Sequence, residues 1–195
     1  FTIYLTRLLS AKGYKVCILS RGYRGQAENN EGLVSDGNRI LMTARQAGDE
    51  PYLLASLLPE IPIAVGRNRF IAGMQALKRC DIDVFVLDDG FQHLRLFRDL
   101  DLVLLDKRCP LGDGRLLPHG ALREPPSALS RAHALIFLHT ANRSKAIERH
   151  NLPGFKSIPQ TKPYFYGHHK PYVSKIINGN GSHPFENQCP HTDNL

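Results

Sequence analysis

The sequence predicts an α/β protein with a mostly parallel sheet and helices on both faces of it. Segments typical of strands and of helices alternate along the chain, with short connectors between them. Two apolar segments, 84–87 and 102–105, are continuous, as in strands that are covered on both faces of a parallel sheet. Each runs directly into aspartate, at Asp88 and Asp106. Ligands bind at the carboxyl ends of such strands, so the aspartates mark a candidate site.

The first half of the chain contains the clearest periodic patterns, and Gly13 closes the first of them as a helix cap. In chain order we expect a helix over 1–12, a strand over 14–19, a hairpin of 33–34 and 40–42 around Asp36-Gly37, a helix over 52–58, a strand over 61–65 and a helix from 69 to about 80.

The second half contains a loop over 107–126 that is rich in Gly and Pro. Because it is longer than ordinary connections, we expect it to be functional. The elements expected after it are a helix over 127–131, a strand over 134–138, a helix over 141–150 and the start of a strand over 156–160. From about Tyr164 the chain has no periodicity, which indicates irregular structure.

Asp88 and Asp89 are the central candidates for chemistry. Carboxylate oxygens are hard ligands, suited to Mg²⁺ beside a nucleotide phosphate. The alternative is a polar turn that only ends a strand at Gly90. The second strand that ends in aspartate, only a few residues further on, favours a site.

Two further strand ends carry arginines. The glycine-punctuated loop at 20–25 follows a predicted strand, and glycines let a backbone approach a phosphate that Arg21 or Arg24 could pair with. Arg67 and Arg69 lie at a strand-to-helix junction. The alternatives are a common turn for the loop and a solvated helix start for the junction, although the helix dipole disfavours cations there.

Asp49 and Glu50 precede the helix predicted over 52–58. Either carboxylate could cap that helix, which is the ordinary role of acidic residues at a helix start.

Five motifs follow one another over roughly the first three-quarters of the chain. They are SRGYRG at 20–25, GDEP at 48–51, VGRNR at 65–69, DDGFQH at 88–93 and GDGRLLPHGALREP at 112–125. Together they are more specific than any one motif. Their order resembles that of the tetraacyldisaccharide 4'-kinase family, whose members act in the lipid A pathway.

The resemblance implies a P-loop-NTPase-like kinase fold and the cofactors ATP and Mg²⁺. It implies transfer of the γ-phosphoryl group of ATP to the 4'-hydroxyl of a tetraacyldisaccharide 1-phosphate. By the same resemblance, Asp49 is the general base, assisted in the family by a histidine of the C-terminal domain.

The remaining site residues follow from the matched motifs. Asp88 is expected to hold the metal, and Asp89 to support the metal or the acceptor. His93 is expected to hydrogen-bond within the catalytic site. Arg21, Arg67 and Arg123 are expected to balance phosphate charge, and Arg123 with Glu124 to contact nucleotide or metal.

The chain has 25 Lys and Arg against 18 Asp and Glu, a formal net charge of +7 that favours anionic partners. The resemblance points to an acylated disaccharide lipid and to the inner-membrane surface, with a cytoplasmic, peripheral location. Nucleic acid is not expected, because no aromatic-basic platform or known module is present. The four cysteines have no CxxC spacing, and Cys17 is expected to be a small core residue.

The chain opens on Phe1, inside a predicted helix that in the family follows a Gly-rich phosphate loop. We therefore expect a fragment, with an incomplete kinase core over 1–163 and an irregular tail, or divergent start of a second domain, over 164–195. The second hypothesis from the sequence is a nucleotide-binding fragment without catalytic activity.

Overall fold

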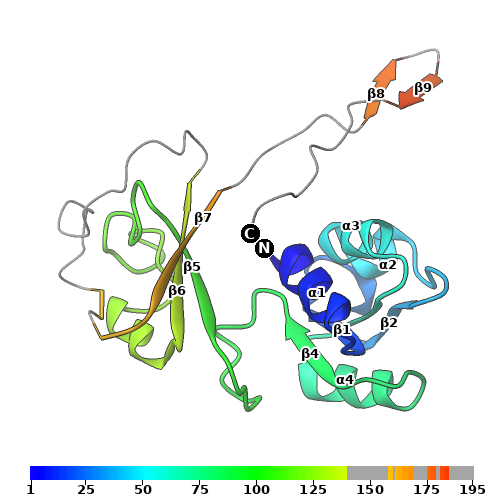
Figure 1. Ribbon diagram of the computed structural model, residues 1–195, viewed down its shortest axis with the longest axis horizontal. Coiled ribbons are helices and arrows are strands. Elements are labelled where there is room, and N and C mark those ends of the chain that lie inside the picture. The colour runs from blue at the N-terminus through cyan, green and yellow to red at the C-terminus, as the bar shows by residue number, and fades with distance from the viewer. Residues whose placement is uncertain (140–157, 160, 169–174, 179–180, 185–195) are drawn as a thin grey trace. The chain divides into compact units, whose positions relative to one another are not determined.

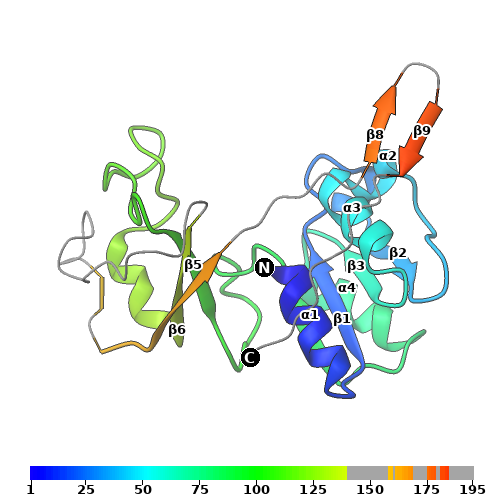
Figure 2. The same cartoon turned by 45° about the horizontal axis from the view of Figure 1, so that its top comes forward.

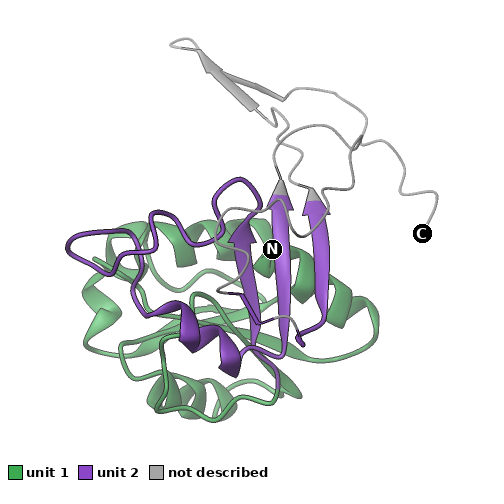
Figure 3. Cartoon of the chain, turned by 90° about the vertical axis from the view of Figure 1, so that its left-hand side faces the viewer, with its two compact units in different colours: residues 1–99 green, residues 100–195 purple. Residues whose placement is uncertain are grey.

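The structure is a computed structural model that describes residues 1–139, 158–159, 161–168, 175–178 and 181–184 (Figure 1). The chain divides into two units, Phe1–Asp99 and Leu100–Leu195 (Figure 3). The boundary expected at residue 163 stays a prediction.

The first unit is built on a four-stranded sheet in the order β2-β3-β1-β4. β1 pairs in parallel with both β3 and β4, whereas β2 pairs antiparallel with β3. The carboxyl ends of β3, β1 and β4 therefore lie at the same edge of the sheet. The strands are β1 (Val16–Ser20), β2 (Gly32–Asp36), β3 (Pro62–Val65) and β4 (Val84–Leu87).

Helices cover both faces of this sheet. Successive side chains of a strand point to opposite faces, and in β1 the side chains on both faces are apolar. Val16 and Ile18 of β1 belong to one apolar cluster, which includes residues of α1 (Thr2–Ala11) and α3 (Asp49–Leu57). Cys17 and Leu19 belong to the cluster on the other face, with residues of α4 (Arg69–Leu77). The two views of the ribbon show the sheet between these helices (Figures 1 and 2).

Two short elements complete the described part of this unit. They are the 3₁₀ helix η1 (Gln26–Glu28) and the helix α2 (Ala44–Ala47). α2 begins with a reciprocal capping box between Thr43 and Gln46.

α4 lies close to the sheet because its inner face carries small residues. Ala72, Gly73 and Ala76 are buried there. The side-chain oxygen of Asn68 accepts hydrogen bonds from the backbone N–H groups of Phe70 and Ile71, which fixes the start of the helix. This capped start holds Arg69 at the carboxyl end of β3.

The second unit contains a three-stranded parallel sheet in the order β5-β6-β7. The rings of Phe137, Tyr164 and Tyr166 pack against one another on this sheet, at centroid separations of 5.6–6.3 Å. Its elements are β5 (Leu102–Asp106), the 3₁₀ helix η2 (Pro126–Arg131), β6 (Ala134–His139) and β7 (Tyr164–His168), and a separate antiparallel pair consists of β8 (Lys175–Asn178) and β9 (Gly181–Pro184).

The structure corrects three expectations from the sequence. The segment expected to be irregular from Tyr164 onward contains β7, in which Tyr164 and Tyr166 pack on Phe137, and the pair β8 and β9. Residues 127–131 lie in a 3₁₀ helix, and the hairpin partner at 40–42 is reduced to a single bridge between Ser35 and Ile40. The helix expected over 141–150 lies outside the described residues, as does most of the strand expected over 156–160.

The sequence predicts that Asp88 and Asp89 follow a central strand of the parallel sheet, and the position of β4 contradicts this prediction. β4 is an edge strand of the four-stranded sheet, and Val86 is its only buried residue. A continuous apolar run predicts a buried strand, but it does not determine which strands lie beside it in the sheet. Among the described residues, no helix has the length and apolar character needed to cross a bilayer.

Candidate active site

Three segments of the first unit meet at the carboxyl edge of β3, β1 and β4. The backbone N–H of Asp88 donates to the carbonyl of Leu19 at 2.9 Å, and that of Gly66 donates to the carbonyl of Ser20 at 3.2 Å. The loop after β1 therefore lies between the VGRNR and DDGFQH motifs. The strand ends that carry these motifs therefore lie together, although β4 is the edge strand.

Asp88 is half-buried and accepts a hydrogen bond from the first residue of α1. Thr2 Oγ1 donates to Asp88 Oδ1 at 2.7 Å. This contact orients the carboxylate and leaves its second oxygen for other partners. No local pattern points to Thr2, because Thr2 and Asp88 are 86 positions apart in the sequence.

Asp89 turns away from the strand path by a left-handed backbone conformation. Its φ is +48°, and aspartate tolerates this region better than most residues other than glycine. Gly90 is required next to it, since a Cβ there would lie 2.6 Å from Leu87 Cβ. The two neighbouring carboxylates thus leave β4 through a tight turn, with Asp88 half-buried and Asp89 exposed.

The donor set of this turn fits Mg²⁺. The described residues contain no group of three or more His, Cys, Asp or Glu side chains that could hold a metal. Mg²⁺ in kinases is held by one or two carboxylates, with phosphates and water completing its shell. Asp88 and Asp89 supply that number of carboxylates and the right ligand type.

The loop after β1 is held by Glu28 of η1. Arg21 Nε donates to Glu28 Oε1 at 2.7 Å, and the backbone N–H of Arg24 donates to Glu28 Oε2 at 3.2 Å. The guanidinium carbons of both arginines lie 5.3–5.8 Å from the ring centroid of Tyr23. Arg21, which the sequence predicts as a phosphate contact, is thus held in position by the carboxylate of Glu28.

Arg69 lies at the same strand-to-helix junction as Arg67 and is the buried cation of this edge. It is only 6% exposed, and its Nε has no hydrogen-bond partner within the described part of the chain. Burial lowers its pKa, and the charge of Arg21 acts in the same direction, whereas Asp89, Glu28 and Asp88 act in the opposite direction. A buried guanidinium is costly unless it is paired. Arg69 therefore favours an anion at this edge of the sheet.

His93 follows the carboxylates on the same segment. Burial lowers the pKa of its imidazole, and the positive charges of Arg69, Arg98 and Arg95 lower it further. The guanidinium of Arg98 also donates to the backbone carbonyl of His93 and so fixes the turn. The imidazole is therefore mainly neutral at pH 7, able to donate one hydrogen bond and accept another.

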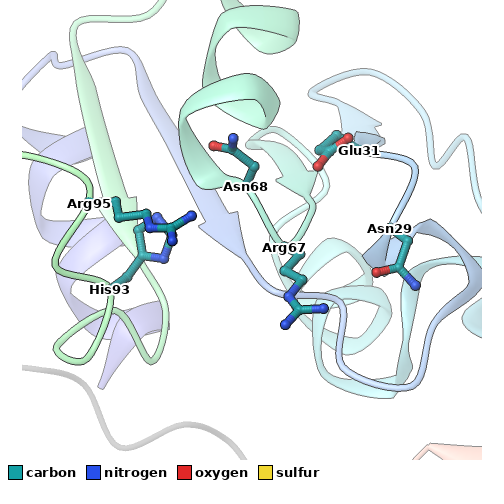
Figure 4. Close-up of a pocket in the computed structure, with 6 residues that line it drawn as sticks. All are labelled: Asn29, Glu31, Arg67, Asn68, His93 and Arg95. Atoms are coloured by element: carbon teal, nitrogen blue, oxygen red, sulfur yellow. The ribbon is translucent and has the colours of Figure 1, made fainter.

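A pocket of about 250 Å³ lies beside this turn, within the first unit. Figure 4 shows His93 and Arg95 on one side of it, and Arg67 and Asn29 on the other. The six lining residues are Asn29, Glu31, Arg67, Asn68, His93 and Arg95. The structure thus brings the predicted residues Arg67 and His93 together, with Arg95, to which the sequence analysis assigned no role.

Asp49 begins α3 and is exposed. The expected capping role is wrong, because the N-cap is Gly48 and no side chain caps this helix. Instead Gly48, with φ +91°, packs on the loop after β1, and a Cβ there would lie 3.0 Å from the carbonyl oxygen of Tyr23. The GDEP and SRGYRG motifs are therefore neighbours in space. The role of Asp49 as general base stays a prediction.

Arg123 and Glu124 belong to the second unit. Both oxygens of Glu124 accept from Arg131 Nη2, at 3.0 and 2.8 Å, which ties the loop to η2. Arg123 is exposed. Their roles as contacts to nucleotide or metal stay predictions.

Comparison with known proteins identifies the relatives of this chain. Residues 1–188 match the family model described as LpxK: Tetraacyldisaccharide-1-P 4'-kinase. A tetraacyldisaccharide 4'-kinase of Pelobacter propionicus is 51% identical over 135 residues, which are 69% of this chain and 37% of the relative. That of Syntrophus aciditrophicus is 44% identical over 183 residues, which are 91% of this chain and 49% of the relative.

A solved structure agrees with these relatives. The crystal structure of an "apo" form of LpxK from Aquifex aeolicus in complex with ATP matches with a TM-score of 0.69 and 38% identity, over 85% of this chain and 48% of that one. The match confirms the expected P-loop kinase-like α/β fold. The chain spans half or less of the length of these relatives. It belongs to the tetraacyldisaccharide-1-P 4'-kinase family.

Proposed function

We propose that this chain supplies part of the active site of an ATP-dependent, Mg²⁺-dependent kinase that phosphorylates the 4'-hydroxyl of a tetraacyldisaccharide 1-phosphate in lipid A biosynthesis. The observation that carries the proposal is the meeting of two carboxylates and several arginines at one edge of the β3-β1-β4 sheet. This arrangement suits phosphoryl transfer, in which catalysis comes mainly from positioning and from charge stabilisation.

The reaction exchanges one P–O bond for another. The 4'-oxygen of the acceptor forms a bond to the γ-phosphorus, and the bond from that phosphorus to the β–γ bridging oxygen breaks. ADP leaves with the electron pair, and the hydroxyl proton passes to the carboxylate of Asp49. A positioned general base contributes roughly 10²–10⁴-fold to such a step.

The other residues hold and neutralise the reacting groups. Asp88, oriented by Thr2, and Asp89 would hold Mg²⁺, which when bound draws charge from the β- and γ-phosphates. Arg21 balances phosphate charge from its fixed position on Glu28.

Four further residues complete the proposed roles. Arg67 and Arg123 also balance phosphate charge, and Glu124 orients the loop that carries Arg123. His93, as a neutral imidazole, hydrogen-bonds within the site. The partners proposed with this function are the acylated disaccharide lipid and the inner-membrane surface on the cytoplasmic side, without nucleic acid.

The direct test is transfer of labelled γ-phosphate from ATP to detergent-dispersed tetraacyldisaccharide 1-phosphate by the whole protein that contains this chain. Asp88→Asn should abolish most of the Mg²⁺-dependent transfer. Asp81→Asn is the matched control, because Asp81 forms an exposed ion pair with Lys15 and precedes β4 rather than following it. Equal activity of the two variants would contradict the assignment of Asp88.

The second candidate is a nucleotide-binding chain without turnover. It is favoured for the isolated 195 residues by the fact that they span half or less of the relatives' length. The same assay on these residues separates the candidates, since Mg²⁺-dependent ATP binding without phosphorylated product supports the second one.

A further inference from the structure

The pocket lined by Asn29, Glu31, Arg67, Asn68, His93 and Arg95, here called the arginine pocket, carries more positive than negative charge. Arg67 and Arg95 come from different segments, after β3 and after β4. The only carboxylate among the lining residues is that of Glu31. Within the part of the chain that the structure describes, neither guanidinium takes part in an ion pair, whereas Arg21 is paired with Glu28. Two such guanidinium groups in one pocket favour an anionic ligand.

The walls of the arginine pocket are fixed before any ligand binds. The backbone N–H of Arg67 donates to the carbonyl of Glu28 at 2.6 Å. Gly66 packs directly on the stem of Glu31, so that a Cβ there would lie 2.2 Å from Glu31 Cγ. Asn68 uses its side-chain oxygen to cap α4, which leaves the N–H donors of its amide for other contacts. The backbone that carries Arg67 and Asn68 is therefore fixed before an anion binds, and the exposed guanidinium groups are free to turn toward it.

The size and chemistry of the arginine pocket distinguish it from a nucleotide site. Its volume of about 250 Å³ is below the roughly 300–1,000 Å³ typical of pockets that enclose a whole ligand. It also lacks the pair of aspartates that suits Mg²⁺ beside a triphosphate, since Asp88 and Asp89 do not line it. One phosphate group fits these limits better than ATP does.

The name of the matched family gives its phosphate acceptor as a tetraacyldisaccharide that already carries a phosphate at position 1. We propose that the arginine pocket binds the phosphomonoester group of this acceptor, with Arg67 and Arg95 as its cationic contacts and Asn68 as a neutral donor. The inference rests on the proposed function, and it assigns Arg67 to the acceptor rather than to the nucleotide.

The test measures binding of glucosamine 1-phosphate to the full 195-residue chain by NMR titration, with glucosamine and inorganic phosphate as separate probes. Arg95→Gln should weaken glucosamine 1-phosphate binding about tenfold, the effect of losing one charge-assisted hydrogen bond. Arg95→Lys keeps the charge but loses the planar guanidinium group. Its affinity for glucosamine 1-phosphate should therefore lie between those of the wild type and of Arg95→Gln. Arg79→Gln is the control for net charge, because Arg79 is exposed, follows the end of α4 and does not line the pocket.

Three results would overturn the proposal. The first is equal weakening by Arg79→Gln and Arg95→Gln, which would show unspecific attraction. The second is inorganic phosphate that binds as tightly as the sugar phosphate, which would mark a site for free phosphate. The third is displacement of the probe by ATP with Mg²⁺, which would mark a nucleotide subsite.

Binding of ATP with Mg²⁺ to Asp88→Asn is measured in parallel. Unchanged ATP binding in that variant would count against the proposed function, while the glucosamine 1-phosphate titration would still report on the arginine pocket. Unchanged ATP binding in Arg95→Gln, together with lost sugar-phosphate binding, is the result expected if both proposals hold.

Discussion

At the scale of single residues, negatively charged carboxylates lie beside positively charged arginines at the carboxyl edge of the first sheet. Glu28 holds Arg21, and Asp89, Glu28 and Asp88 partly offset the positive charge of the buried Arg69. Anionic phosphates would add negative charge where the cations exceed the carboxylates, which is the preorganised electrostatics that phosphoryl transfer uses.

A first prediction concerns Asp49. In the whole protein Asp49→Ala should lower the rate of the chemical step roughly 10²–10⁴-fold while ATP binding is retained, because the variant lacks only the group that accepts the hydroxyl proton. Single-turnover kinetics and ATP titration measure the two effects. Glu50→Ala is the matched control, since Glu50 is the adjacent exposed carboxylate in the same helical turn. Near-normal turnover of Asp49→Ala would remove it from the mechanism.

A second prediction concerns the protonation of His93. Its pKa is lowered in the folded chain, first by burial and then by three arginines, so protonation opposes folding. The stability that the neutral imidazole contributes is present above the unfolded pKa of about 6.5 and is lost as the pH falls below it. NMR titration should give a midpoint below that of the urea-unfolded chain, and Arg95→Gln should raise it. A folded midpoint at or above the unfolded one would contradict this reading.

At the scale of elements, glycines hold the loop after β1 against the turn between α2 and α3. Gly22 and Gly48 have positive φ angles, and a Cβ at Gly25 would lie 2.6 Å from the backbone of Ala47 and Gly48. The SRGYRG and GDEP motifs therefore pack backbone against backbone. This contact places Asp49 beside the loop that carries Arg21.

Gly25→Ala should consequently destabilise the first unit by about 1–3 kcal/mol, the range for overpacking against groups that cannot move. Gly73→Ala is the informative comparison, because the nearest atom to its Cβ, on Leu19, would lie at 3.5 Å, an ordinary contact. It lies inside α4, where alanine is favoured over glycine by up to about 1 kcal/mol, so it should stabilise. Urea unfolding of both variants measures the two effects. A loss in Gly73→Ala equal to that in Gly25→Ala would contradict the packing argument.

At the scale of the whole molecule, the net charge of +7 is the feature that bears on partners. An anionic membrane attracts a basic protein by roughly 1 kcal/mol per residue near its surface, and salt screens the attraction. The proposed membrane surface and the alternative of nucleic acid both carry negative charge, so charge alone does not separate them.

Vesicle sedimentation separates these partners. The chain should bind vesicles of phosphatidylcholine with 30% phosphatidylglycerol more tightly than vesicles of phosphatidylcholine alone, and it should lose that preference between about 0.05 and 0.5 M salt. Duplex DNA at the same ionic strength is the comparison for general attraction to polyanions. Tighter binding to DNA than to the anionic vesicles would count against the membrane surface as the partner.

Local sequence was sufficient for most of the elements. The run at 84–87 predicted β4 with its correct bounds, and the alternation of apolar segments predicted a largely parallel sheet with helices on both faces. These predictions succeed because hydrophobic periodicity and strand-ending polar residues are properties of neighbours in sequence. The motif order was also sufficient for the family, which the comparisons confirmed.

Tertiary structure alone decided the arrangement of the site. Thr2 contacts Asp88, Arg69 rather than Arg67 is the buried cation, and Arg95 joins Arg67 in one pocket. The edge position of β4 and the pairing of β7 with β6 were likewise invisible in local patterns. Each of these features depends on contacts between residues far apart in sequence, and a local pattern records the need for burial or pairing without naming the partner.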